Sequence, residues 1–391
     1  MERERQPGAM TRNLPARTQA RQAALLGAPG RAVRIGSPAA VLAVVPHLLG
    51  FVPRRSLIVI GAGPPRDRIN VTLRYDLPDP PDRAAAGRIT AHALSVLAGQ
   101  RQTVAVVAGY GPGALVTPIA DVMRGEVPRA GLDLRDLLRV EDGRYWSYLC
   151  REPSCCPPEG LPLDPRHPAA SALAAAGGPV FPDRDALAAT ISPLSGTAAR
   201  SMRDATARAE ARAASMLIRP SRSGRPDACR LVVLEGLSAV ADAITTYRSG
   251  RRFTSDEQVA WLSVVLTILR VRDDAWARMD PVHREAHSRL WADVVRRASQ
   301  RYVPAPASLL AFTAWQSGNG ALANVALERA LEADAGYTMA LLLRDAIDAG
   351  APPSMAVLPM SPEEVAAHYA TSGDIEGAGM SWDTGDCGDR E

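Results

Sequence analysis

The chain of 391 residues contains no lysine, and all 45 of its basic residues are arginine. Enzymes that form a Schiff base, including those that use pyridoxal phosphate, need a lysine amine. A Walker-type phosphate loop and the third strand of a protein kinase also need a lysine. These classes are therefore excluded. Together with the abundant alanine, glycine and proline, the bias is typical of a GC-rich genome that avoids AT-rich lysine codons.

Aromatic residues are scarce, at 5%, and no apolar run approaches the length of a transmembrane helix. The N-terminal segment is charged, and its apolar stretch Ala23–Leu26 is too short for the core of a signal peptide. Met10 offers an alternative start. The five cysteines are an odd number and unevenly placed. Without an export signal we expect reduced thiols, and hence a cytoplasmic protein.

Charge is distributed unevenly, although the net charge of +3 is too small to argue for nucleic-acid binding by the whole chain. Residues 1–34 carry seven arginines against Glu2 and Glu4, whereas residues 372–391 carry six acidic residues against Arg390. Both ends lack apolar periodicity, which predicts disorder. The basic leader is the one segment that could contact nucleic acid, although a solvated extension is the simpler interpretation.

Residues 36–150 have the pattern of a mixed α/β unit. Ser37 and Pro38 suit the N-cap and first position of a helix that ends at Gly50. The expected helices are 39–49, 82–97 and 114–123, and the expected strands are 56–60, 68–77, 103–108, 134–140 and 145–149. Strict alternation over 68–77 predicts a half-buried strand, and the turn Glu141–Arg144 predicts a hairpin. Both parallel and antiparallel pairs are expected.

Strand signals nearly vanish after Ala169, and the second half of the chain reads as all-α. Helices are predicted at 196–218, 230–248, 254–269, 283–299, 305–317, 320–333, 337–348 and 362–370. The predicted organisation is a disordered basic leader (1–34), a mixed α/β domain with a Cys-Pro loop (35–195), an all-α domain (196–350), and a loop, short helix and acidic disordered tail (351–391).

The segments 305–317 and 320–333 form a helical hairpin pattern around a Gly-Asn-Gly turn. Small and large apolar residues recur at helical spacing, and A-x-x-x-L-E-R-A-L follows the turn. This resembles one tetratricopeptide repeat, which needs neighbouring helices to bury its faces. An ordinary helical hairpin is an equal alternative. If the unit binds another protein, Trp315 and Arg329 are the candidate contact residues.

The most unusual segment is Asp142–Gly160, which holds Cys150, Cys155 and Cys156. A metal would recruit these thiolates and His167, but the spacing Cys-x4-Cys-Cys differs from the Cys-x-x-Cys of zinc knuckles, and adjacent cysteines usually point apart. A redox site would pair Cys150 with either of the others. The third interpretation, small cysteines packed in a proline-clamped loop, is favoured, and no metal site or cofactor is predicted.

Gly109–Gly113 follows a buried strand and opens a helix, so its backbone N–H groups could hold an anion. The spacing is not G-x-G-x-x-G, and a tight turn is the favoured interpretation. Such an anion could be bound bidentately by arginine side chains, of which the candidates are Arg55, Arg74 and Arg144. The candidate ligand-binding residues are Gly109, Tyr110, Gly111, Gly113, Arg144 and Trp146.

His283 and His287 lie four residues apart with Glu285 between them, in the order H-R-E-A-H rather than H-E-x-x-H. Without a third ligand, a solvated helix face is expected. The sequence has no G-x-S-x-G nucleophile elbow and no P-C-x-x-C deaminase signature.

Several segments together resemble an actinobacterial family known only as a domain of unknown function. The matching pieces are Ser37-Pro38, Pro46–Phe51, Pro53, Ser56–Val59, Gly109–Gly111, Gly143–Cys150, Cys155–Gly160, Ala314-Trp315, Gly318 and Ala326–Leu331. The resemblance covers roughly 35–350, and the tryptophan–cysteine stretch is its most specific part. It implies a two-part architecture and a cytoplasmic setting, and it brings no catalytic residues.

Two hypotheses of function follow. The first is a non-enzymatic regulatory or scaffold protein, in which the α/β part senses a small anionic ligand and the helical part holds a protein partner. The second is an enzyme with a thiol-dependent or metal-assisted site between the Gly109 turn and the Cys150–Cys156 loop. The absence of catalytic signatures favours the first.

Overall fold

The computed structural model describes residues 24–26, 33–64, 68–174, 179–218, 225–356, 358 and 360–371. The chain divides into two compact units, the first of residues 1–48 and 54–178 and the second of residues 49–53 and 179–391. The second unit includes α5 (Arg184–Ala189), which precedes residue 195, where the sequence-based domain boundary was placed. The acidic tail and most of the basic leader lie outside the described residues.

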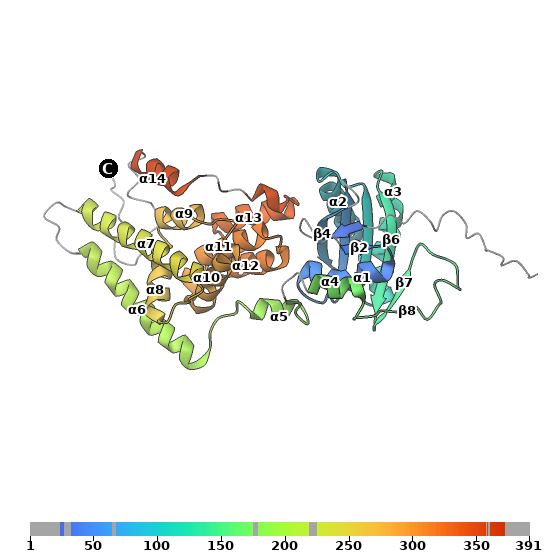
Figure 1. Ribbon diagram of the computed structural model, residues 1–391, viewed down its shortest axis with the longest axis horizontal. Helices are drawn as coiled ribbons and strands as arrows, with labels where there is room; N and C mark the ends of the chain where they lie inside the picture. The colour runs from blue at the N-terminus through green and yellow to red at the C-terminus, as the bar shows by residue number, and fades with distance from the viewer. Residues whose placement is uncertain are drawn as a thin grey trace, which may run out of the picture. The chain divides into compact units, whose positions relative to one another are not determined.

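The described strands of the first unit form one mixed sheet in the order β2-β1-β4-β3-β5-β6-β7-β8 (Figure 1). Their bounds are β1 Ala24–Leu26, β2 Val33–Ile35, β3 Ser56–Gly63, β4 Arg68–Asp76, β5 Val104–Tyr110, β6 Asp133–Glu141, β7 Arg144–Ser147 and β8 Leu161–Pro162. The pairs β1–β4 and β5–β6 are parallel, and the other neighbours are antiparallel. The predicted mixed α/β class is confirmed.

The strand β1 and the first two residues of β2 lie within the segment that was expected to be disordered. The two strands pair with each other in antiparallel register, and β1 adds to the sheet next to β4. Backbone hydrogen bonding to an existing sheet edge thus orders short stretches that carry no periodic signal of their own.

The described helices that accompany the sheet are α1 Pro38–Leu49, α2 Arg83–Gly99, α3 Gly113–Arg129 and α4 Pro168–Ala174. Asp82 caps the N-terminus of α2, and its carboxylate accepts the N–H groups of Ala84 and Ala85. α2 and α3 share one core with the sheet residues Leu57, Val59, Ala105, Val107 and Leu137. The alternating residues Val71, Leu73 and Tyr75 of β4 pack against that core, as their period of two predicts.

The second unit is helical, as predicted. Its described helices are α5 Arg184–Ala189, α6 Gly196–Ile218, α7 Arg225–Arg248, α8 Asp256–Val265, α9 Leu269–Ala277, α10 Arg284–Arg297, α11 Pro304–Gln316, α12 Gly320–Ala333, α13 Thr338–Asp348 and α14 Pro362–Thr371. The single helix predicted over 254–269 is wrong, because α8 ends at Val265 and α9 begins at Leu269. The mostly apolar sequence through 264–268, which has no glycine or proline, conceals this break.

The helix α11 lies at the centre of the second unit. Every residue from Pro304 to Trp315 is buried, and α11 packs against α10, α12 and α13. The α11–α12 hairpin therefore exists where its pattern predicts it, and helices on several sides enclose it.

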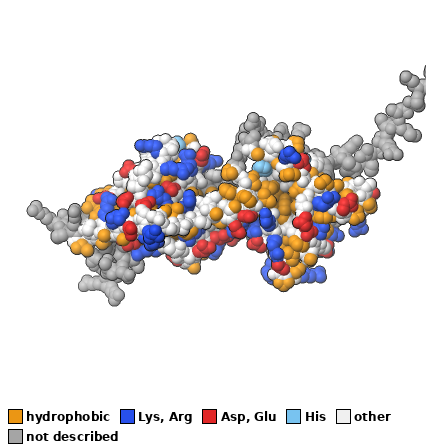
Figure 2. All heavy atoms as spheres, turned by 90° about the horizontal axis from the view of Figure 1, so that it is seen from below, with side chains coloured by type: hydrophobic (Ala, Val, Ile, Leu, Met, Phe, Trp, Pro, Cys, Tyr) orange, Lys and Arg blue, Asp and Glu red, His pale blue; other side chains and the backbone are white. Residues whose placement is uncertain are grey.

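None of the described helices is both long and apolar enough to cross a bilayer. On the face shown in Figure 2, arginine and carboxylate side chains are interspersed on each unit. This mixture agrees with the small net charge of the whole chain.

Candidate metal centre

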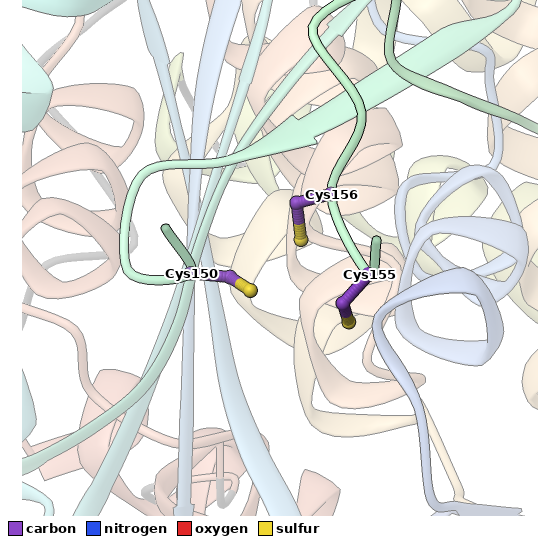
Figure 3. Close-up of side chains that lie close together, drawn as sticks. All are labelled: Cys150, Cys155 and Cys156. Atoms are coloured by element: carbon purple, nitrogen blue, oxygen red, sulfur yellow. The ribbon is translucent and has the colours of Figure 1, made fainter. Parts of the chain in front are cut away.

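The loop between β7 and β8 brings three cysteine side chains together (Figure 3). The backbone N–H of Cys150 donates to Oγ of Ser147 at 3.2 Å, which turns the chain out of β7. The N–H groups of Cys155 and Cys156 then both donate to the carbonyl oxygen of Glu152, at 3.0 and 2.7 Å. The three sulfur atoms lie within 4.8 Å of one another.

This geometry differs from the expectation that adjacent cysteines point apart. The two hydrogen bonds to one carbonyl form a tight turn over Glu152–Cys156, and this turn brings both Cys155 and Cys156 back toward Cys150. A spacing of Cys-x4-Cys-Cys can therefore place three sulfurs in one cluster. Cys155 is exposed, whereas the other two are half-buried.

Cys150 and Cys156 have pKa values shifted in opposite directions. The thiol of Cys156 and the backbone N–H of Glu152 donate to the sulfur of Cys150, and these bonds lower the pKa of Cys150. Burial and the neighbouring Cys150 raise the pKa of Cys156 from 9.0 to about 12. The cluster therefore favours one thiolate and opposes the loss of a second proton. A bound divalent cation would reverse this opposition, because its charge stabilises additional thiolates.

A clamp holds the far end of the loop against β7. The indole N–H of Trp146 donates to the carbonyl oxygen of Pro158 at 2.9 Å. Arg144 donates to the carbonyl oxygens of Glu159 and Gly160, at 2.7 and 2.9 Å. Gly160 has a φ of +78°, and a Cβ there would overlap the Trp146 ring. Arg144 and Trp146, predicted to bind a ligand, thus position the cysteine loop.

Arg139 on β6 completes this arrangement, and the sequence pattern did not single it out. Its guanidinium lies 3.9 Å from the centre of the Trp146 ring and 3.5 Å from a carboxylate oxygen of Glu141. It also occupies the space that a Cβ of Gly113 would need. The parallel pairing of β5 with β6 is what would have pointed to Arg139, because this pairing places it opposite Gly109 at the start of the turn.

The Gly109–Gly113 turn serves packing and hydrogen bonding. A Cβ on Gly109 would lie 2.9 Å from Cγ2 of Val116 and closer still to its Cγ1, so the glycine lets α3 approach β5. The N–H of Gly111 donates to the carbonyl oxygen of Val140 at 2.9 Å. The Tyr110 side chain is buried, and its hydroxyl has no hydrogen-bond partner among the described residues. Burial also raises the pKa of Tyr110.

The two other arginines considered for an anion each have a carboxylate partner. Arg55 pairs with Asp79 and Arg74 with Asp76. Any anion near the Gly109–Gly113 turn would have to compete with these carboxylates.

The histidine pair lies in the helical unit, around Asp280. His283 Nδ1 lies 2.8 Å from one oxygen of Asp280, and His287 Nε2 lies 3.6 Å from the other. The expectation of a solvated face is wrong for His287, whose side chain is 1% exposed. Burial is the main cause that lowers the pKa of His287.

The two candidate partner-binding residues both make contacts inside the helical unit. The Trp315 side chain is 8% exposed, and its indole N–H donates to the carbonyl oxygen of Ala351 at 3.1 Å. Arg329 donates to Oε1 of Gln300 at 2.9 Å, and its side chain is 13% exposed.

The fold and the loop define a class of protein with a mixed α/β unit, a three-cysteine loop and a helical unit. A family model described as a domain of unknown function (DUF4192) matches residues 38–354, and the chain belongs to this family. The match includes the cysteine loop and most of the helical unit, so the predicted resemblance to a domain of unknown function is confirmed. No curated protein and no solved structure matches the chain.

Proposed function

We propose that this chain is a metal-responsive regulatory protein, in which Cys150, Cys155 and Cys156 bind one thiophilic divalent metal ion. The observation that carries this proposal is the convergence of the three sulfurs to within 4.8 Å. In a tetrahedral zinc site with Zn–S bonds of about 2.3 Å, neighbouring sulfurs lie about 3.8 Å apart. Side-chain rotation in this largely exposed loop can supply a contraction of that size.

Zinc is the expected metal, because cysteine thiolates are soft ligands and zinc needs no redox partner. The cluster favours metal binding over the packed-cysteine interpretation, since Cys155 is exposed and buries little apolar surface. A thiolate site of this kind fits the cytoplasmic location expected from the sequence, where thiols stay reduced. The family resemblance is what suggests an actinobacterial source.

A regulatory role is favoured over an enzyme because the group of three sulfurs includes no histidine or carboxylate among the described residues. Within this proposal, the helical unit would hold a protein partner, and the metal state of the loop would affect that binding. The second candidate is a thiol-dependent enzyme, supported by the lowered pKa of Cys150. A disulfide between two of the three cysteines is the corresponding redox product.

Native mass spectrometry of the full chain, purified with reductant and loaded with one equivalent of zinc, tests the proposal. We expect one zinc per chain, lost in the double variant Cys155→Ser/Cys156→Ser. The matched control is Cys229→Ser, because Cys229 is buried in α7 of the other unit. A wild-type chain that remains metal-free, or a double variant that still binds one zinc, would refute the metal site.

A further inference from the structure

The described chain offers three soft ligands to this metal and no fourth. The cluster contains no histidine, aspartate or glutamate among the residues that the structure describes. Closed structural zinc sites have four protein ligands, whereas sites with three keep one position for water or an exogenous group. The missing ligand therefore decides what kind of site this is.

The nearest candidates for a fourth ligand already have other contacts. Oε1 of Glu152 accepts two hydrogen bonds from Ser154, one from its hydroxyl at 2.9 Å and one from the backbone N–H of Ser154 at 3.4 Å. Nδ1 of His167, the ligand considered from the sequence, accepts the N–H of Ala169 at 3.2 Å in the first turn of α4. His167 thus acts at the start of a helix, outside the cysteine group.

The open side of the cluster is on the side of Cys155. Cys155 is exposed, and so are the residues 151–154 that lead to it, whereas Cys150 and Cys156 are half-buried. The clamp formed by Arg144 and Trp146 holds the opposite, C-terminal end of the loop at 158–160. Solvent and small solutes can therefore reach the sulfurs on the side of Cys155.

We infer that the fourth coordination position faces solvent beside Cys155, and that a low-molecular-weight thiolate takes it in place of water. The inference rests on the proposed metal site. In the exchange, the incoming thiol forms a metal–sulfur bond and gives its proton to solvent, and the bound water leaves. Sulfur is the preferred donor because the three existing ligands already select a soft ion. The site would then respond to small thiols as well as to the metal.

Cobalt(II) substitution tests this inference, because Co²⁺ reports coordination geometry and sulfur ligation in its visible and near-ultraviolet absorption. The full chain is loaded with one equivalent of Co²⁺ without oxygen and titrated with 2-mercaptoethanol. Ethylene glycol, which carries a hydroxyl in place of the thiol, is the matched control solute. We expect the visible bands to shift, and sulfur-to-cobalt charge transfer to rise by about a third as a fourth sulfur joins three. Ethylene glycol should change neither.

Each other outcome has one meaning. A cobalt spectrum that does not respond to 2-mercaptoethanol means that no thiolate enters the fourth position, which overturns the inference and leaves the metal site intact. Cobalt recovered in the filtrate after ultrafiltration means that the thiol strips the ion, which also overturns it. A wild-type chain with no cobalt spectrum refutes the proposed function itself. Cys229→Ser should behave as wild type throughout.

Discussion

In the metal-free thiol cluster, Cys150 should react with alkylating agents well ahead of Cys156. The perturbation is limited iodoacetamide, added to reduced and chelator-treated protein. The lowered pKa of Cys150 increases its thiolate fraction near neutral pH, and the thiolate is the reactive form. The raised pKa of Cys156 does the reverse.

The size of the effect on Cys156 follows from its pKa. A rise from 9.0 to about 12 lowers the thiolate fraction at pH 7 by about 1000-fold. A more basic thiolate is intrinsically more nucleophilic, and a Brønsted coefficient of about 0.4–0.5 returns a factor of roughly 16–32. The net expectation is that Cys156 reacts about 30–60-fold more slowly than in the unfolded chain. Raising the pH toward 12 should abolish this protection as long as the loop stays folded.

Peptide mass spectrometry separates the sites, since trypsin cleaves this chain only after arginine. Cleavage after Arg144, Arg151 and Arg166 puts Cys150 in one peptide and the Cys155–Cys156 pair in the next. Fragmentation of the second peptide then distinguishes Cys155 from Cys156. Urea-unfolded protein is the control, and labelling is kept below one group per chain because alkylation of one thiol changes its neighbours. If Cys156 reacts as fast as in the unfolded chain, or ahead of Cys150, the described hydrogen bonding among the thiols is wrong.

Three further predictions concern the fold around the site and the helical unit. Gly109→Ala should destabilise the first unit by about 1–3 kcal/mol, because the new methyl overlaps the stiff Val116 side chain. Gly113→Ala should cost less than about 1 kcal/mol, since it displaces only the end of a flexible arginine. Hydrogen exchange of the β5 peptide measures both, and equal losses would contradict the packing role of Gly109. Trp315→Ala should destabilise the helical unit by about 3–5 kcal/mol in urea unfolding, whereas a loss below about 1 kcal/mol would show that the side chain is not a core residue. The pKa of His287 is lowered in the folded state, so the unfolded state binds more protons. The contribution of His287 to folding stability is therefore present above pH 6.5 and is lost as the pH falls through its folded pKa. His287→Gln should therefore reduce the loss of stability between pH 7.5 and 5 in paired urea titrations, and an unchanged slope would contradict the shift.

The candidate site was only partly predictable from the sequence. The Asp142–Gly160 segment stood out by its composition, and the three cysteines in it are those that the structure brings together. Their geometry was not predictable, because it depends on two hydrogen bonds from Cys155 and Cys156 to the carbonyl oxygen of Glu152. Sequence spacing alone favoured divergent side chains, and so the packed-loop interpretation.

Local periodicity by itself determined the element types, because alternation over 68–77 and helical spacing over 320–333 are set by which faces must be buried. The absence of lysine, a property of composition alone, excludes whole classes of enzyme. Only the tertiary structure decided the roles of individual side chains. Arg139 acquires its place because parallel pairing of β5 and β6 sets it opposite Gly109, and Trp315 is enclosed because α11 is surrounded by other helices. These contacts join residues far apart in the chain, and no local pattern encodes them.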